Sequence, residues 1–502
     1  MPAPATKLAE SLKVLKELQD EGRVAIRSSE LTRTHRERLL KNGFIQEVMK
    51  GWYIPARPDE PTGESTSWYA SFWEFSAEYL QSRFKNQWSL SPEQSISIHI
   101  GDWTVPKQLL VRSPKGTNNS IELLHETSIF DAKLTIPPSK EIREKDGLRL
   151  VNLTSALISC SENQYKSKPI EMRAALSMVT EVSQILRNLL DGNHTTIAGR
   201  IAGAYRNIGR EEFADTIIET MRAAGHELNE TDPFEVKDQF VFSNRETSPH
   251  VNRLKMMWEQ FRTPIIDNFP SPTESPGDTE EYLRNVDAIY VTDAYNSLSI
   301  EGYRVSEALI NRVSEGNWNP DQSEEDKKHR DAMAARGYYQ AFQVVRENIK
   351  NILEGNDPGN IADKNHGKWY RELFSPSITA GIIEAGDLAG YRNRPVYIRR
   401  SKHTPPRSDA VGELMSTFFE LIKQEENPQV RIVLGHFIFV YIHPYIDGNG
   451  RMGRFLMNLM MAAAGISWLV IKVENRDQYM SALESASVDK DIVPFTKFIQ
   501  DQ

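Results

Sequence analysis

In the first 20 residues, apolar positions recur with the period of a helix. Leucines recur at intervals of three and four, at Leu8, Leu12, Leu15 and Leu18. This spacing places them on one face, and it predicts an amphipathic helix that begins near Thr6 and ends at Gly22.

The segment up to residue 60 predicts two short helices and a hairpin. Ser29 can cap a helix that starts at Glu30, and a second helix is expected over residues 34–42. Two β-like runs follow at 44–49 and 52–54, joined through Lys50 and Gly51. The expected order is therefore helix, helix, helix, hairpin.

Residues 65–230 carry mixed signals. The runs SISIHI (95–100) and IELLHETSIF (121–130) are typical of strands, whereas EMRAALSMVTEVSQILRNLL (171–190) is typical of helix. We therefore expect an α+β middle domain. Its histidines His99, His125 and His194 lack the spacing of metal ligands, and we expect them to be structural.

The run NFPSPTESPGDTE (268–280) is rich in proline and polar residues and predicts a linker. Almost everything after it has helical periodicity, over residues 280–297, 305–315, 324–353, 365–373, 408–424, 429–442, 449–464 and 476–486. The apolar stretch 455–471 is shorter than the ~20 residues of a membrane-spanning helix, and we expect a buried helix followed by a short strand.

Composition narrows the class of protein. The chain has 502 residues, enough for about three domains. Its 60 Lys and Arg against 69 Asp and Glu give a net charge of −9, which excludes a global positive field toward nucleic acid or membranes. The single cysteine, Cys160, and an N-terminus unlike a secretory signal favour a cytoplasmic protein without disulfides.

One stretch, HPYIDGNGRMGR (443–454), combines the groups that phosphate chemistry requires. The Gly448–Gly450 turn at the start of a predicted helix can bind an anion through backbone N–H groups. Arg451 and Arg454 lie three apart and can both contact phosphate oxygens. Asp447 suits Mg²⁺, and His443 can accept a proton at neutral pH.

Two other interpretations of this stretch are a structural turn and a calcium loop. A structural turn does not require the histidine, the aspartate and both arginines. In an EF-hand loop that begins at Asp447, Arg451 would occupy the fifth position, where an oxygen ligand is needed. Asn458 would occupy the last position, where a glutamate is needed, so the sequence does not fit a calcium loop.

The stretch resembles the signature HPFx(D/E)GNGRxxR of Fic-domain proteins, with Tyr445 at the usual phenylalanine. The resemblance covers residues 240–502 and implies an all-α core that transfers AMP from ATP to a Ser, Thr or Tyr hydroxyl of a protein, with release of pyrophosphate. It implies His443 as the base, Asp447 as the Mg²⁺ ligand, and an ATP site formed by Gly448, Asn449, Gly450, Arg451, Met452, Gly453, Arg454 and Tyr479. Kinase-like relatives such as the Doc toxins carry Lys at the position of Gly450.

Two further segments resemble parts of Fic proteins. The run AGYRNRPVYIRRSKHTPP (389–406) resembles the β-hairpin flap that binds the target by β-augmentation, through Val396, Tyr397, Ile398 and Arg399. The run SLSIEG (297–302) resembles the inhibitory motif (S/T)xxxE(G/N). This resemblance implies that Ser297 and Glu301 share one helix face and that Glu301 pairs with Arg454, blocking the γ-phosphate.

The first 60 residues resemble the winged helix of abortive-infection antitoxin-like regulators. Its second and third helices carry Arg33, Arg36, Arg38 and Lys41, which suits either DNA binding or a solvated face of a protein-interaction module.

We therefore predict a multidomain protein with a winged helix (1–60), an α+β middle domain (61–235) and a Fic region (236–502). The Fic region contains the linker 268–280, an inhibitory helix 280–301 and a catalytic core 302–502 with a small β-hairpin flap. Expected partners are ATP, a target protein or the chain itself, DNA through residues 1–60, and a second copy in a homodimer. Alternatives are transfer of another group, such as UMP or phosphocholine, and a DNA-binding regulator that uses the core as a sensor.

Overall fold

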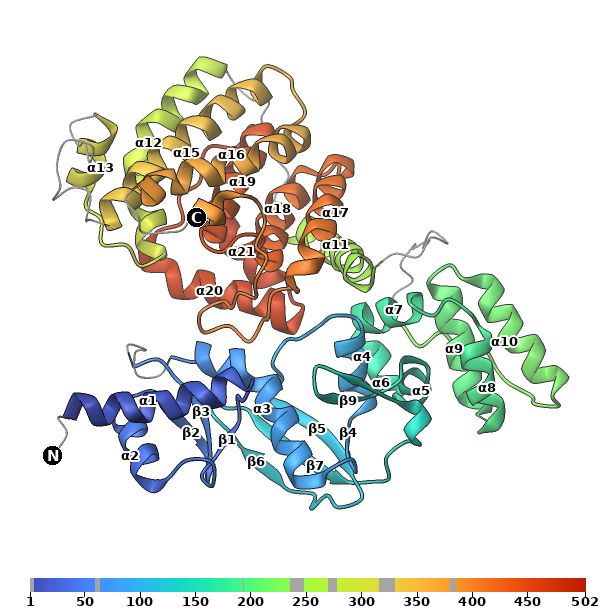
Figure 1. The fold of residues 1–502 in the computed structure, drawn as a ribbon. Helices are drawn as coiled ribbons and strands as arrows, with labels where there is room; N and C mark the ends of the chain where they lie inside the picture. Colours follow the sequence, from blue (N-terminus) through green and yellow to red (C-terminus); the bar gives the residue numbers. More distant parts are fainter. Residues whose placement is uncertain are drawn as a thin grey trace. The chain divides into compact units, whose positions relative to one another are not determined.

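The computed structural model describes residues 4–58, 64–192, 194–234, 248–269, 278–315, 330–379 and 385–502. Contacts divide the chain into two compact units (Figure 1). The first contains residues up to Arg253 together with Tyr397–Thr404. The second contains Leu254–Val396 and Pro405–Gln502. The helix α11 (Pro249–Asn268) begins in the first unit and continues into the second.

The first unit starts with two helices and a three-stranded antiparallel sheet of order β1-β3-β2. These elements are α1 (Pro4–Asp20), β1 (Ile26–Arg27), α2 (Arg33–Lys41), β2 (Ile45–Met49) and β3 (Trp52–Pro55). The helix predicted from Glu30 is wrong. The Glu30 carboxylate instead accepts the backbone N–H of Arg27 at 2.7 Å and closes a turn, and the next helix begins only after the Thr32 cap.

The arginines of α2 are largely engaged within the protein. Arg38 donates to Ser11 Oγ of α1 at 2.8 Å, and Arg33 pairs with Glu37 on its own helix at 2.7 Å. Arg36 donates to a backbone carbonyl of the preceding turn. Three of the four basic side chains expected to face DNA are thus already bound, which weakens the interpretation of α2 as a groove-binding helix.

The next part of the unit is built on a four-stranded sheet of order β4-β5-β7-β6, in which β5 and β7 are parallel. Its strands are β4 (Ser89–Leu90), β5 (Gln108–Ser113), β6 (Ser120–Glu122) and β7 (Ser128–Lys133). The helix α3 (Thr66–Phe84) packs Trp68, Phe72 and Phe75 into the same core as Leu109 and Ile129. This arrangement confirms the strands expected within 121–130.

The strand expected at 95–100 is wrong, because this segment lies in the helix α4 (Pro92–His99). Ser91 accepts the backbone N–H of Gln94 at 3.2 Å, and Pro92 occupies the first turn, where its missing donor costs nothing. Strong N-terminal capping therefore decides the structure, although the Ser-Ile alternation suits a strand.

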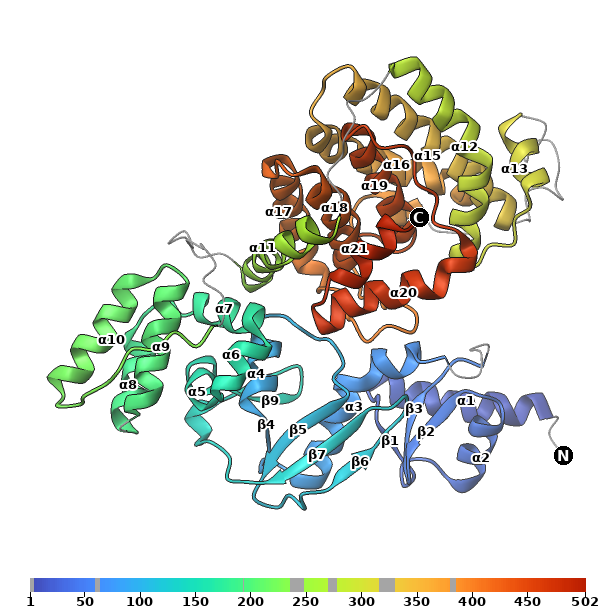
Figure 2. The same cartoon turned by 180° about the vertical axis from the view of Figure 1, so that it is seen from behind.

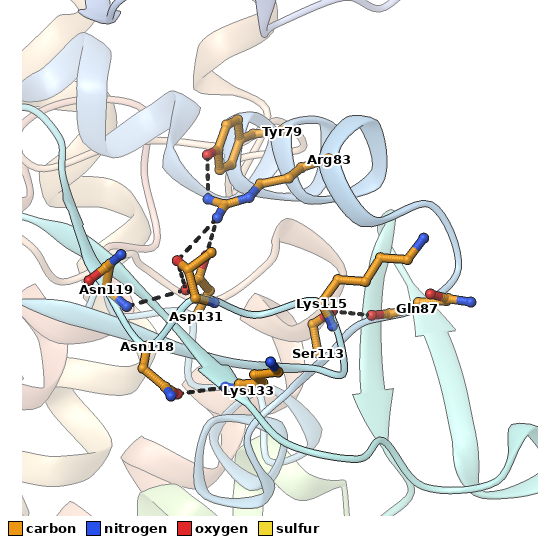
Figure 3. Close-up of polar contacts among 10 residues, drawn as sticks. Tyr79, Arg83, Gln87, Ser113, Lys115, Asn118, Asn119, Asp131 and Lys133 are labelled. Carbon is orange, nitrogen blue, oxygen red and sulfur yellow. Dashed lines mark hydrogen bonds and ion pairs between the residues drawn. The ribbon is translucent and has the colours of Figure 1, made fainter.

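The parallel strands are joined to a loop through a buried carboxylate on β7 (Figure 3). Asp131 is fully buried and accepts the backbone N–H and the hydroxyl of Thr117 at 2.9 and 2.8 Å. It also pairs with Arg83 of α3, which donates to Tyr79 at 2.9 Å. Because local donors already occupy this carboxylate, we interpret the cluster as structural.

The unit continues with the two-stranded sheet β8 (Ile142–Lys145) and β9 (Leu148–Val151), preceded by a short 3₁₀ turn η1 (Ser139–Glu141). A helical subdomain follows, in which α9 and α10 run side by side (Figure 2). Its helices are α5 (Leu153–Ser159), α6 (Glu162–Ser167), α7 (Pro169–Ser177), α8 (Ser183–Asp191), α9 (Thr195–Asn207) and α10 (Glu211–Ala223). The helical prediction for 171–190 is confirmed, although the segment divides into α7 and α8.

The described part of the second unit contains helices and turns and no strand. Its helices are α12 (Thr279–Ile300), α13 (Glu307–Ser314), α15 (Arg330–Leu353), α16 (Pro358–Thr379), α17 (Val411–Gln424), α18 (Pro428–Ile442), α19 (Asn449–Ala463), α20 (Arg476–Glu484) and α21 (Val493–Gln500). Short turns of 3₁₀ or π-helix also occur, namely η2 (Ala385–Leu388), η3 (Ser408–Ala410), η4 (Val473–Asn475) and η5 (Ser485–Asp489). The predicted linker lies largely in 270–277, outside the described residues, as does the expected helix start at 324.

The helices α18 and α19 pack against each other at the centre of this unit (Figure 1). Both are buried on nearly every side, as expected for helices without a polar face. The short strand expected after residue 464 is wrong. Asn458 bonds both the N–H and the carbonyl of Leu469, at 2.7 and 3.0 Å, so a side chain satisfies the backbone where a strand partner would. Within the described residues, no helix is long and apolar enough to cross a membrane.

Candidate active site at the start of α19

The loop between α18 and α19 is held in one conformation by its own side chains. Asn449 accepts the backbone N–H of Tyr445 at 3.0 Å and donates to the carbonyl of the same residue at 2.9 Å. The Tyr445 ring is buried and stacks on Tyr370 with centroids 3.9 Å apart, as expected for a core aromatic. Gly448 has φ 79°, where a Cβ would meet Phe374 at 2.7 Å, so glycine is required there.

His443 ends α18 in the left-handed conformation, with φ 53° and ψ 60°. Its Nδ1 lies 3.1 Å from the carbonyl of Val440. A carbonyl only accepts, so Nδ1 carries the proton and Nε2 has a free lone pair. Burial lowers the pKa of His443 to about 4, which keeps the ring neutral at pH 7 and able to accept a proton.

The two arginines of the signature are almost completely buried. Arg451 is 1% exposed, and its Nε and one Nη have no hydrogen-bond acceptor. Its guanidinium lies between the rings of Tyr303 and Phe374, 5.2 and 5.0 Å from their centroids. Arg454 is 3% exposed and has one Nη without an acceptor. Buried donors without partners are rare, and here they point to an anionic ligand.

Arg454 is held by the end of α12. It donates to the Ser297 hydroxyl at 2.9 Å, to the Ser297 carbonyl at 3.1 Å, and to Glu301 at 2.7 Å. The expected pairing of Glu301 with Arg454 is therefore present. Glu301 Oε1 lies so close to Gly450 that a Cβ at residue 450 would clash with it. The absence of a side chain at residue 450 thus makes room for the glutamate over the first turn of α19.

Two buried networks lie behind this contact. On α12, Asp293 accepts the Tyr338 hydroxyl at 2.5 Å, and burial raises the pKa of its carboxyl to about 6. On α20, the hydroxyl of Tyr479 lies 2.8 Å from His436 Nε2. Tyr479 is 1% exposed, so the structure places it in the core, and the expected adenine contact stays a prediction.

Asp447 is the carboxylate that is available to a cation. Its side chain is 53% exposed and lies 3.6 Å from Arg451. Within the described residues, no cluster of three or more His, Cys, Asp or Glu could hold a metal by itself. A single carboxylate beside an anion site fits Mg²⁺, which usually takes one or two carboxylates and completes its coordination with substrate phosphates and water.

The structure assigns packing roles to three residues of the expected ATP site. The Asn449 side chain is used within the loop. Met452 is fully buried, and a Cβ on Gly453 would meet Val440 of α18 at 2.9 Å. These residues position α19 against α18, and they can contribute only backbone N–H groups to a phosphate.

The short strand expected at Val396–Arg399 is absent, because these residues have no regular secondary structure. Residues 397–404 belong to the first unit, where the carbonyl of Lys402 accepts the Val105 N–H at 2.9 Å and Arg399 pairs with the buried Glu64. The predicted β-hairpin flap is therefore wrong in its secondary structure. Target binding by Val396, Tyr397, Ile398 and Arg399 stays a prediction.

Three residues that the sequence did not single out contact the site or α12. Arg392 donates to the carbonyl of His443 at 2.8 Å. Arg476 donates to the carbonyl of Ile300 at 2.8 Å, and Asn296 accepts the Val473 N–H at 2.9 Å. Each bonds the main chain of a distant segment, so no spacing rule finds it. For Arg392, the only signal in the sequence was its position within the flap-like run 389–406.

Comparison with known proteins agrees with this geometry. Residues 366–461 match the Fic/DOC family. Protein adenylyltransferase Fic of Drosophila grimshawi is 30% identical over 42% of this chain and 41% of its own length. The Aedes aegypti protein of the same name is 28% identical over 48% of this chain and 46% of its own. The chain thus spans less than half of these relatives.

Solved structures of Fic proteins also match. A fragment of Fic-1 from C. elegans is 17% identical and covers 67% of this chain and 95% of its own, with a TM-score of 0.36. A Fic family protein from Desulfovibrio desulfuricans is 20% identical, covers 51% and 72%, and has a TM-score of 0.33. At TM-scores below 0.5 these structures do not establish a shared fold. The family match over residues 366–461, together with a signature that departs from the usual pattern only at Tyr445, identifies a Fic domain in the C-terminal part of this chain.

Proposed function

We propose that the chain transfers AMP from ATP to a hydroxyl of a target protein, releases pyrophosphate, and is held inactive by Glu301. The observation that carries the proposal is the pair of buried arginines. Arg451 and Arg454 keep N–H groups without acceptors at the N-terminus of α19, next to a neutral histidine. A polyphosphate supplies the acceptors that these groups lack.

The proposed reaction needs one proton acceptor and a site for negative charge. His443 Nε2 takes the proton of the target hydroxyl, and the hydroxyl oxygen forms a bond to the α-phosphorus. The bond from that phosphorus to the bridging oxygen breaks, and pyrophosphate leaves with the electron pair. Arg451 and Arg454 donate to the departing phosphates, which stabilises the charge that develops on them.

Asp447 would hold Mg²⁺, which when bound neutralises phosphate charge. The backbone N–H groups at the start of α19 lack helical partners and point toward the same anion. Positioning and charge neutralisation together provide most of the catalysis expected for transfer of a phosphorus group.

Glu301 competes with the nucleotide for Arg454. Its carboxylate occupies one Nη at 2.7 Å, and its oxygen covers Gly450. A phosphate at this position would require the glutamate to leave, and this supports the proposal that Glu301 inhibits the reaction. The identification of a relative as a protein adenylyltransferase supports AMP as the transferred group. UMP or phosphocholine transfer remains the alternative, because the arginines recognise phosphate and not the base.

The test uses full-length protein, Mg²⁺, a cell lysate, and ATP labelled on either the α- or the γ-phosphate. Incorporation of α label alone, lost in His443→Ala, is the expected result. Label from the γ-phosphate would indicate a kinase, and label from neither would favour another donor. Competition by unlabelled UTP or CDP-choline then separates those donors. Salt-dependent binding of the full chain to duplex DNA tests the regulator alternative.

A further inference from the structure

One buried cation beside the active-site loop has no carboxylate partner within the described residues. Arg392 is 4% exposed, and its guanidinium bonds only main-chain carbonyls. It donates to His443 at 2.8 Å, to Arg394 at 3.3 Å, to Ile442 at 3.4 Å and to Pro406. Burial lowers the pKa of Arg392 to about 10, so the side chain is still a cation at neutral pH.

Two of the four carbonyls that Arg392 binds, those of Ile442 and His443, are ones that the end of a helix leaves without partners. Ile442 is the last residue of α18, and His443 caps it. The final carbonyls of a helix lack intrahelical donors and carry the negative end of the dipole, which favours a cation. The side chain therefore replaces solvent at the buried end of α18.

The main chain of Arg392 binds the same loop. Its backbone N–H donates to the carbonyl of Pro444 at 2.9 Å. Side chain and backbone together therefore fix the carbonyl groups of three consecutive residues, 442 to 444. His443 lies at the centre of this segment with φ 53°, a left-handed conformation that is unfavourable for a residue with a Cβ.

We propose that Arg392 is a positioning residue that holds His443 in its left-handed conformation, so that Nε2 stays directed at the reacting hydroxyl. This inference rests on the proposed function, in which His443 is the base. The imidazole direction depends on the backbone at residue 443, and in the observed left-handed conformation Nδ1 lies 3.1 Å from the Val440 carbonyl. Without the guanidinium, the carbonyls of Ile442 and His443 lose this donor, and the loop can relax toward ordinary φ values.

The kinetic test compares variants of the full-length chain that carry Glu301→Gly, so that activity is measurable. Arg392→Gln should lower kcat about 100-fold, as expected for a misplaced catalytic group, with the KM for ATP changed less than about threefold. The matched control is Arg262→Gln. Arg262 also bonds a buried group of the same unit, Glu425, at 3.0 Å, but contacts no residue of the loop. The control should change neither value.

Chemical rescue separates positioning from a general loss of structure. Millimolar guanidinium should raise the kcat of Arg392→Ala at least tenfold. It should not affect the Arg262→Ala control. Unchanged kcat in Arg392→Gln would overturn the proposal. A parallel loss of activity and of folded protein, without rescue, would also overturn it, because that result indicates a purely structural cap.

A second readout does not depend on activity. In protein labelled with ¹³C at histidine Cε1, the His443 signal is assigned by its loss in His443→Ala. Its pKa should rise toward 6.5 in Arg392→Gln, because the ring loses both its buried position and a nearby cation. An unchanged pKa would overturn the proposal. If the Glu301→Gly parent transfers no AMP, the proposed function fails, and this measurement still decides the role of Arg392.

Discussion

Glu301→Gly should activate AMP transfer, and the structure gives the size of the effect. The substitution removes a charge-assisted hydrogen bond of 2.7 Å to Arg454, whose side chain is 3% exposed. Such a bond contributes about 1.5–3 kcal/mol. At about 1.4 kcal/mol per tenfold change, its loss shifts the balance between blocked and open sites by about tenfold to hundredfold. The bonds of Arg454 to Ser297 are kept, so the arginine stays in place.

The assay measures incorporation of label from [α-³²P]ATP at equal protein concentrations. Glu301→Gln should give intermediate activation, because it keeps the shape and loses the charge. The matched control is Glu281→Gly, which removes an exposed glutamate from the first turn of the same helix. If Glu301→Gly has wild-type activity while His443→Ala abolishes label, the glutamate does not limit access to Arg454 and the inhibition hypothesis is wrong.

Three further predictions concern the residues around this contact. Arg476→Gln removes the 2.8 Å bond to the Ile300 carbonyl at the end of α12, next to Glu301. Loss of this hydrogen bond, worth about 0.5–1.5 kcal/mol, should raise incorporation of label two- to tenfold. Reduced incorporation would contradict this prediction. Asp447→Asn should raise the Mg²⁺ concentration required for half-maximal incorporation, and an unchanged requirement would exclude Asp447 as the ligand. Burial lowers the pKa of His443 to about 4 and of His436 to about 3, whereas unfolded histidine titrates near 6.5. The unfolded chain thus binds more protons below pH 6.5, so the unfolding temperature should fall between pH 6.5 and 4, and a histidine contribution is excluded if calorimetry shows no decrease.

The helices around the active site follow from local sequence. Asn427 accepts the Val430 N–H at 3.2 Å, and Pro428 begins α18, so both signals for its start are adjacent in the chain. The functional residues of the signature lie within twelve positions of each other. Their proximity needs only the short loop and the first turn of α19, and the sequence alone therefore predicts that they lie together.

The errors occur where distant contacts decide between local alternatives. The alternation at 95–100 suits a strand, but Ser91 and Pro92 start a helix there, and Ile96 and Ile98 are buried in either case. The β-like run at 396–399 forms no ladder. Arg399 of this run pairs with Glu64, and Lys402 just after it accepts the Val105 N–H. Both partners lie more than 290 positions earlier in the chain, so no local sequence pattern predicts these contacts.

Arginines that bind main-chain carbonyls are the least predictable part of the site. Arg392 and Arg476 are recognised only because a helix end lies within reach of each guanidinium. Every residue has a backbone carbonyl, so the sequence of the segment that accepts the hydrogen bond does not indicate that an arginine binds it. Such residues are identified by asking which buried helix ends have donors, a question that requires coordinates.

The two arginines of the signature differ in their hydrogen-bond partners, and this difference bears on how Glu301 would inhibit the proposed reaction. Arg454 is bound by Ser297 and Glu301 and keeps one free Nη, whereas Arg451 keeps two nitrogens without acceptors. The proposed inhibition by Glu301 would therefore engage Arg454 and leave Arg451 without a carboxylate hydrogen bond. The anion site stays formed in the blocked state, because the aromatic rings around Arg451 hold its guanidinium without any carboxylate hydrogen bond. Under the proposed function, activation would require the Glu301 carboxylate to leave Arg454, whereas the loop would already be formed.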